Sequence, residues 1–243
     1  MGTKERRERQ LYEREQRLLA VARELIVRDG LLNLQMSKLA KASEHAMGTI
    51  YQHFASKEDL YLALVTESVA EYAALFQRVA AWQANSRDRM FAIAVADSVF
   101  VRRNPEHFRL AQYALCEVVW GAASLARREA HHAASQPISE AVMCIVQDGL
   151  RQGELLANGM SPEEISTGFW AMSQGIHTLA HAEGLLEQYA VHRPYGLLAR
   201  HIQFLLNGMG WQPLSPLTGD ALNALITRIR AEVLHDWCDD VAK

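Results

Sequence analysis

Cysteines, prolines and long apolar runs are all scarce in this chain. The three cysteines, Cys116, Cys144 and Cys238, lie far apart among 243 residues and form no C-x-x-C pair. This spacing excludes a disulfide framework and a zinc ribbon, and it fits a reducing compartment. No run approaches the ~18 consecutive apolar residues of a membrane span. The densely charged start, MGTKERRERQ, does not resemble a signal peptide. We therefore expect a cytoplasmic protein with no membrane partner.

An excess of charge of either sign is also missing. The formal net charge is -3, so the chain as a whole has no positive field that would attract a polyanion. Residues 1–60 contain 11 Lys/Arg and 9 Asp/Glu, which leaves 14 and 19 for the rest. A nucleic-acid partner is therefore expected only near the front of the chain, through a local patch.

The prolines and the apolar pattern indicate an all-α fold. Only 6 prolines occur, and those at 105, 137, 162 and 194 stand where a helical pattern begins, a position that suits proline. Ser161 and Glu164 match a capping box ahead of one of these helices. Apolar residues make up 49% of the chain and recur at spacings of three and four. After a first helix that ends at Gly30, the predicted helices cover about 35–42, 46–52, 57–83, 87–103, 105–132, 137–152, 162–186, 194–207 and 219–237.

Residues 48–62, GTIYQHFASKEDLYL, carry polar and aromatic side chains that a core does not require. Ile50 and Phe54 are four residues apart and are predicted to face the core, which leaves Thr49, Tyr51, Gln52 and His53 on outward or flanking faces. Three short helices within ~45 residues, the last two joined by a tight turn, describe a helix-turn-helix unit.

The segment GLLNLQMSKLAKASEHAMGTIYQHFASKEDL resembles the DNA-binding segment of the TetR/AcrR transcriptional regulators. Gly30, the pair Leu39-Ala40 and the run from Gly48 to Leu60 carry this resemblance, which covers residues 15–62. It implies a helix-turn-helix DNA-binding domain at 1–60 and a helical effector-binding and dimerisation domain at 61–243. It also implies a homodimer that binds a double-stranded DNA operator. The sequence departs from the family at Glu44, where the turn commonly has glycine.

Side-chain chemistry and the resemblance together give the expected DNA contacts. Hydroxyl, phenol, imidazole and ammonium groups can donate to phosphate oxygens, and a glycine lets the backbone approach the duplex. We expect Tyr51, His53 and Lys57 to contact phosphates, and Met47 to Thr49 and Gln52 to lie closest to base edges. The alternative is a merely solvated polar face. The full set of expected DNA-binding residues is Ser37, Met47, Gly48, Thr49, Tyr51, Gln52, His53 and Lys57.

Residues 87–182 are expected to enclose a small-molecule effector site, because large flat side chains there alternate with a few polar anchors. Core packing alone would also explain the aromatic residues. The stripe Ile165, Phe169, Met172, Ile176 and Leu179 is suited to helix packing, either between subunits, as the resemblance implies for this helix pair, or within one subunit. The expected effector-binding residues are Phe100, Tyr113, Trp120, Trp170, Gln174 and His177.

No catalytic pattern such as G-x-S-x-G, H-E-x-x-H or Walker A occurs, so neither an enzyme nor a cofactor is expected. His177 and His181, at i and i+4 near Glu183, could share a metal, but no third ligand at suitable spacing follows and we predict no metal site. Asp97 and Glu117 are acids in apolar surroundings, which either contact an effector or pair with an arginine. The favoured function is a repressor released by an apolar effector. The alternative is an architectural or protein-partner module without an effector.

Overall fold

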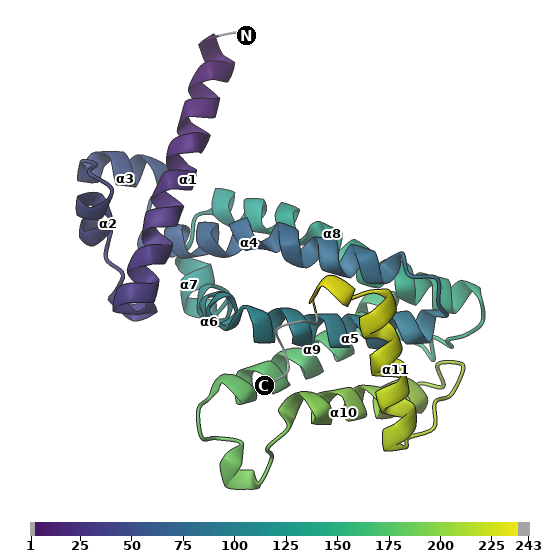
Figure 1. Ribbon diagram of the computed structural model, residues 1–243. Helices are drawn as coiled ribbons and strands as arrows, with labels where there is room; N and C mark the ends of the chain where they lie inside the picture. The colour runs from purple at the N-terminus through teal and green to yellow at the C-terminus, as the bar shows by residue number, and fades with distance from the viewer. Residues whose placement is uncertain (1–2, 238–243) are drawn as a thin grey trace. The chain divides into compact units, whose positions relative to one another are not determined.

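The structure is a computed structural model that describes residues 3–237 (Figure 1). These residues form eleven α-helices and three short 3-10 helices, with no β-strand among them. The predicted all-α fold class is therefore confirmed. Cys238 and the last residues of the predicted C-terminal domain lie outside the described residues. Between residues 3 and 237, none of the helices combines the length and the apolar character that a bilayer span requires.

The chain divides into two compact units. The first comprises the chain up to Val69 together with Leu110–Ala134, and the second comprises Ala70–Arg109 and the chain from Ser135 onward. Three helices contribute residues to both units: α4 (Lys57–Ala80), α6 (Pro105–Ala114) and α8 (Leu125–Arg151). The domain boundary expected at residue 60 concerns function and stays a prediction.

The first unit is built around the N-terminal helices α1 (Thr3–Asp29), α2 (Met36–Ala42) and α3 (Met47–His53), with α2 packed against both α1 and α3 (Figure 1). The 3-10 helix η1 (Leu31–Asn33) and helix α7 (Glu117–Ala122) complete it. Leu18, Ala22 and Leu25, spaced three and four apart on α1, are buried in one cluster with residues of α2 and α3. Helical spacing of apolar residues therefore supplies the core of this unit.

Helix α5 (Ser86–Arg103) forms the centre of the second unit and is buried on nearly every side, as its all-round apolar sequence predicts. Helices α9 (Pro162–His181), α10 (Pro194–Gly208) and α11 (Gly219–Glu232) pack against it. The 3-10 helices η2 (Glu187–Tyr189) and η3 (His235–Trp237) follow α9 and α11. The capping box at the start of α9 is confirmed, with the N–H of Ser161 2.7 Å from the Glu164 carboxylate.

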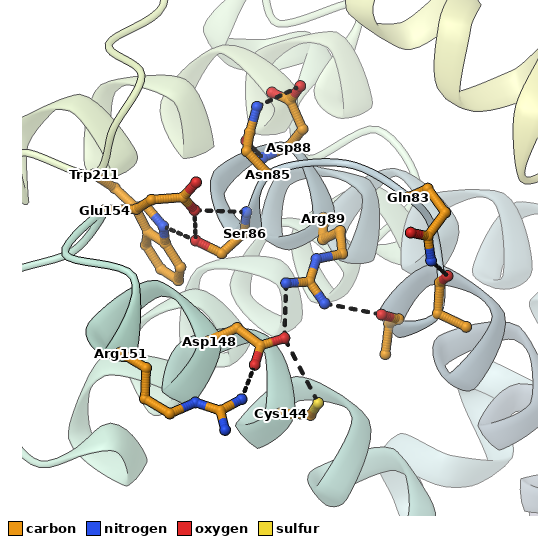
Figure 2. A network of polar contacts seen from close by, with 12 residues as sticks. Gln83, Asn85, Ser86, Asp88, Arg89, Cys144, Asp148, Arg151, Glu154 and Trp211 are labelled. Carbon is orange, nitrogen blue, oxygen red and sulfur yellow. Dashed lines mark hydrogen bonds and ion pairs between the residues drawn. The ribbon is translucent and has the colours of Figure 1, made fainter.

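Polar contacts hold the start of α5 against the end of α8 and the segment after α10 (Figure 2). The Glu154 carboxylate accepts hydrogen bonds from the Ser86 N–H at 2.9 Å and from its hydroxyl at 2.5 Å. Trp211 Nε1 donates to Ser86 Oγ at 2.7 Å, and Arg89 donates to Asp148 at 2.8 Å. The Glu154 side chain thus satisfies the Ser86 N–H at the buried start of α5, a group that has no partner within the helix.

Several predicted helix boundaries are wrong. The helices expected to end at 186 and 237 end earlier, at His181 and Glu232. The helix expected at 105–132 is divided into α6, α7 and the first turns of α8. Ser124 marks the break, because its N–H and hydroxyl donate to Asp59 at 2.7 and 3.0 Å, while its oxygen accepts from the Arg127 N–H at 3.4 Å. The start expected at Pro137 is wrong because α8 continues through that residue. Proline removes one hydrogen bond from this helix, and helix-favouring residues on both sides continue it.

Candidate nucleic-acid interface

Residues 43–46 connect α2 to α3 in a tight turn. The His45 N–H donates to the Ala40 carbonyl at 3.0 Å, which closes the end of α2. Glu44 has φ 57, a left-handed value that favours glycine. Glu44 therefore holds a strained conformation at the position where the sequence departs from the family pattern.

The inner side of α3 anchors the helix in the first unit. Ile50 and Phe54 are both 0% exposed and pack in the cluster that contains Leu18 and Leu39. The predicted inward orientation of Ile50 and Phe54 is confirmed. This burial fixes which side of α3 the solvent reaches.

The opposite side of α3 carries the exposed residues Met47, Gly48, Tyr51 and Gln52, here named the α3 outer face. Met47 and Tyr51 are four residues apart, as are Gly48 and Gln52, so the two pairs lie on one side of the helix. Met47 is 40% and Tyr51 50% exposed, which is high for such large side chains. A Cβ added at Gly48 would meet no atom within 4 Å, so packing of the chain itself does not require glycine there.

The remaining predicted contacts flank the α3 outer face. Ser37 is exposed on the first turn of α2, and Thr49 is half-buried on α3. Lys57 is half-buried in the first turn of α4, where its Nζ lies 3.4 Å from the Leu32 carbonyl oxygen and 5.3 Å from the centre of the Tyr61 ring. Lys57 therefore has partners within the first unit and keeps part of its surface in solvent.

The His53 side chain points into the first unit. It is 4% exposed, and its Nδ1 lies 3.5 Å from the Glu15 carboxylate on α1. Burial alone would raise the pKa of Glu15, but the hydrogen bond and charge of Arg127, aided by His53, hold that pKa below its ordinary value. A phosphate contact by His53 does not fit this placement, because the ring is enclosed beside a carboxylate. In this placement His53 lies outside the candidate interface.

Arg127, on the first turn of α8, supports the end of α3 and was not found by sequence reasoning. Its guanidinium donates to both oxygens of Glu15 at 2.7 and 2.9 Å and to the His53 carbonyl at 2.7 Å. It also lies 5.2 Å from the centre of the Phe54 ring. The available signal was Ser124, a cap residue whose position would have placed Arg127 in a first helical turn.

The six predicted effector residues are distributed over both units. The second unit contains Phe100, Gln174 and His177. Phe100 is buried, whereas Gln174 is partly exposed. Tyr113 and Trp120 belong to the first unit, where Tyr113 packs edge-on against Tyr61 at 5.2 Å between ring centres and Trp120 against His132 at 5.1 Å. Each of these two rings therefore has packing partners within the first unit.

Trp170, the sixth predicted effector residue, is 65% exposed and does not fit a wall of an enclosed site. The buried side of α9 consists of residues at four-residue spacing, one of which is Phe169. Trp170 follows Phe169 directly and therefore points about 100° away from it around the helix. Met172 and Ile176, two residues of the predicted packing stripe, pack against the core of the second unit. These two residues therefore pack within one subunit, which was one of the two alternatives for the stripe. The residues of the buried side are Ile165, Phe169, Ser173 and His177.

The acidic and imidazole groups that the sequence singled out have internal partners or are exposed. Between residues 3 and 237, no group of three His, Cys, Asp or Glu side chains could hold a metal ion. His177 Nε2 lies 2.9 Å from Asp97, and His181 Nδ1 lies 2.9 Å from the His177 carbonyl oxygen. Asp97 therefore has His177 and, at 2.6 Å, the Tyr72 hydroxyl as hydrogen-bond partners, where an arginine was one of the two alternatives. Glu117 is exposed in the first turn of α7.

Comparison with known proteins identifies the N-terminal segment. The family model described as bacterial regulatory proteins, tetR family, matches residues 18–64. An HTH-type transcriptional regulator of Staphylococcus aureus is 30% identical over 67 residues, which are 28% of this chain and 36% of that protein. The chain thus matches about a third of the length of this curated relative.

Solved structures extend the likeness to most of the fold. A TetR/AcrR regulator from Thermobifida fusca is 21% identical with a TM-score of 0.57, covering 81% of this chain and 98% of that one. FadR from Bacillus subtilis, solved in complex with stearoyl-CoA, is 18% identical with a TM-score of 0.59, covering 79% and 98%. At these identities the likeness concerns the fold alone. Residues 18–64 thus match the tetR family of bacterial regulatory proteins by sequence, and most of the chain shares its helical fold with solved regulators.

Proposed function

We propose that this protein is a transcriptional regulator that binds duplex DNA through the α3 outer face. The observation that carries the proposal is the exposed set of Met47, Gly48, Tyr51 and Gln52 on a helix whose other side is fixed by buried residues. A helix of this kind, following a tight turn, can enter the major groove. A regulator of this kind needs no catalytic group, and access to the chromosome places it in the cytoplasm.

The side chains divide into two roles. Tyr51 and Lys57 contact phosphates, as does Ser37 from α2, because their hydroxyl and ammonium groups donate to anionic oxygens. Met47 and Gln52 approach base edges, where Gln52 can pair with adenine and Met47 can contact a thymine methyl group. Gly48 and Thr49 lie between them at the start of α3.

The protein acts as a homodimer on an inverted-repeat operator. Two-fold symmetry of the protein is matched by symmetry of the site, with half-sites about one helical turn, ~34–36 Å, apart. We place the subunit contact at the helix pair that the family resemblance indicates, and Trp170 on α9, 65% exposed, is available for it.

A small apolar effector, bound in the second unit, releases the operator. The helical fold is shared with FadR, whose structure contains stearoyl-CoA, and this likeness supports the proposal that the protein responds to a ligand. The alternative is an architectural module whose second unit binds no effector. A compound that changes operator affinity distinguishes the two, because only a regulator couples its two sites, typically by ~1–3 kcal/mol.

The test is selection of operators from random duplex DNA, followed by measurement of affinity against salt concentration. Lys57→Ala should weaken all selected sites similarly and reduce the salt slope by about 1, because it removes one phosphate contact. Arg230→Ala, an exposed cation on α11, is the matched control and should change neither quantity. Failure to enrich any inverted repeat would overturn the proposal.

A further inference from the structure

Three linked polar side chains lie in the apolar core of the second unit. The Tyr72 hydroxyl donates to Asp97 Oδ1 at 2.6 Å, and His177 Nε2 lies 2.9 Å from Asp97 Oδ2. Asp97 is 4% and His177 0% exposed. The rings of Phe76 and Phe100 lie 4.6 and 4.5 Å from the Tyr72 ring centre. A polar set in such surroundings is stable only when its groups are hydrogen-bonded.

The hydrogen bonds assign the protons of this set. Burial first, and then the charge and hydrogen bond of Asp97, raises the pKa of Tyr72 well above its ordinary value, so Tyr72 keeps its proton and donates it. Both Asp97 oxygens therefore accept, and His177 places its hydrogen on Nε2. In the neutral imidazole, this leaves Nδ1 as an unprotonated acceptor.

The acceptor at His177 Nδ1 has no partner among the residues that the structure describes. His181, one turn later, uses its own Nδ1 on the His177 carbonyl oxygen at 2.9 Å. The other neighbours are rings, with the centres of Phe108 and Tyr195 at 5.4 and 5.7 Å from that of His177. Native cores rarely retain an unpaired acceptor of this kind unless something else binds to it.

We propose that His177 Nδ1 is the polar anchor of a small-molecule site whose ligand is an aromatic alcohol of the phenol class. The inference rests on the proposed function, because it names the chemistry of the effector in the second unit. One unpaired acceptor matches the single hydrogen of a hydroxyl, whereas an ammonium group would leave two N–H groups unpaired. A carboxylate would bring a second negative charge into a core that already holds Asp97.

The rings that surround His177 suit an aromatic ligand. Phe108 presents its ring at 71° to that of His177, and aromatic pairs favour such tilted or edge-on arrangements. Tyr195, in the first turn of α10, is only half-buried, and the Arg102 guanidinium lies 5.5 Å from its ring centre. Because His177 is fully enclosed, a ligand enters only after a neighbour moves, and Tyr195 is the most exposed of these rings. Binding is therefore slower than diffusion.

The experiment uses phenol as the probe, with anisole, which has the ring but no donor, and benzylamine, which carries an ammonium group. Thermal unfolding of the full chain and the ¹⁵N resonances of the His177 ring are measured during titration. Phenol should raise the Tm and shift the Nδ1 resonance, while anisole and benzylamine should do neither. His177→Phe should weaken phenol binding about 10-fold or more. His181→Phe is the matched control and should bind phenol as the native chain does.

The inference is overturned if saturating phenol leaves the Nδ1 resonance unchanged, or if anisole binds as tightly as phenol. If His177→Phe does not fold, His177→Gln replaces it: the Gln amide can still donate to Asp97 but supplies no acceptor in the place of Nδ1, so phenol affinity should still fall, and an unchanged affinity contradicts the site. Operator binding separates this inference from the proposed function. If phenol binds at His177 but operator affinity does not change, only the effector role of this site is wrong. If other compounds release the DNA but phenol does not bind, only the phenol site is wrong and the proposed function stands.

Discussion

Gly48 occupies a helical position where glycine costs stability and the chain itself offers no reason for it. A Cβ there would meet no atom within 4 Å, so Gly48→Ala should fit and raise the free energy of unfolding by about 0.5–1 kcal/mol. If the backbone of α3 approaches DNA at this point, the added methyl group should weaken operator binding about 10-fold or more, since that requires only ~1.4 kcal/mol. Denaturant unfolding and operator titration measure the two effects.

Gly48→Ala is thus expected to raise stability while lowering operator affinity, and Gly121→Ala is the control for this pair of effects. Gly121 is exposed on α7, belongs to the first unit and likewise has no atom within 4 Å of an added Cβ. It should stabilise the protein similarly without weakening operator binding. Should Gly48→Ala retain full affinity, close approach of the backbone at α3 is wrong.

For single residues, the sequence predicts which face of a helix is buried better than it predicts which residues a side chain contacts. Ile50 and Phe54 are buried as their spacing requires, because four-residue periodicity determines which side of a helix a residue occupies. The placement of His53 was not predictable in the same way. Its neighbour Glu15 comes from another helix, and a half-apolar imidazole suits either a surface or an enclosed ion pair.

Helices with strong caps were predicted well, and helices divided by long-range contacts were not. Ser161 and Glu164 are close in sequence, so the start of α9 could be derived locally. The start of α8 at Leu125 depends on Ser124 and its bonds to Asp59, a residue of α4. Pro137 was misleading because a proline indicates a helix start only where the preceding residues are not already helical.

The packing of α1 against α8 should depend on pH through Glu15. The pKa of this carboxyl is below its ordinary value of 4.5, so the folded state favours the carboxylate. The contribution of Glu15 to stability is therefore complete above pH 4.5 and is lost as the pH falls through the lower folded value. Glu15→Gln should reduce the free energy of unfolding by about 1–2 kcal/mol at pH 7, because it breaks a two-bond pair with Arg127.

Denaturant unfolding of the native chain and Glu15→Gln from pH 7 to pH 3 checks this expectation. The difference between them should shrink as the pH falls from 4.5 through the lower folded pKa of Glu15, since below that value both chains carry an uncharged side chain at position 15. Glu13→Gln is the control, because the Glu13 side chain is 50% exposed and pairs with Arg9, which is 68% exposed. A difference that stays constant with pH contradicts the assigned role of Glu15.

For the whole molecule, the division into two units follows from contacts that no local pattern shows. Residues 110–134 join the N-terminal helices in the first unit although they lie far along the chain. Because α4, α6 and α8 each supply residues to both units, a change in one unit can reach the other through continuous helices. Coupling of this kind is reciprocal, so an effector that weakens operator binding must itself bind less tightly when the operator is present.

Dimerisation is the property on which an inverted-repeat operator depends, and Trp170 offers the test. Its side chain is 65% exposed, so Trp170→Glu should leave helical content unchanged while placing a charge in the proposed subunit contact. We expect monomers in sedimentation and a fall in operator affinity of ~100-fold or more, because a monomer loses the gain from binding both half-sites together. Phe204→Glu, on α10 and 47% exposed, is the matched control and should remain dimeric. A dimeric Trp170→Glu protein with native operator affinity would place the subunit contact elsewhere.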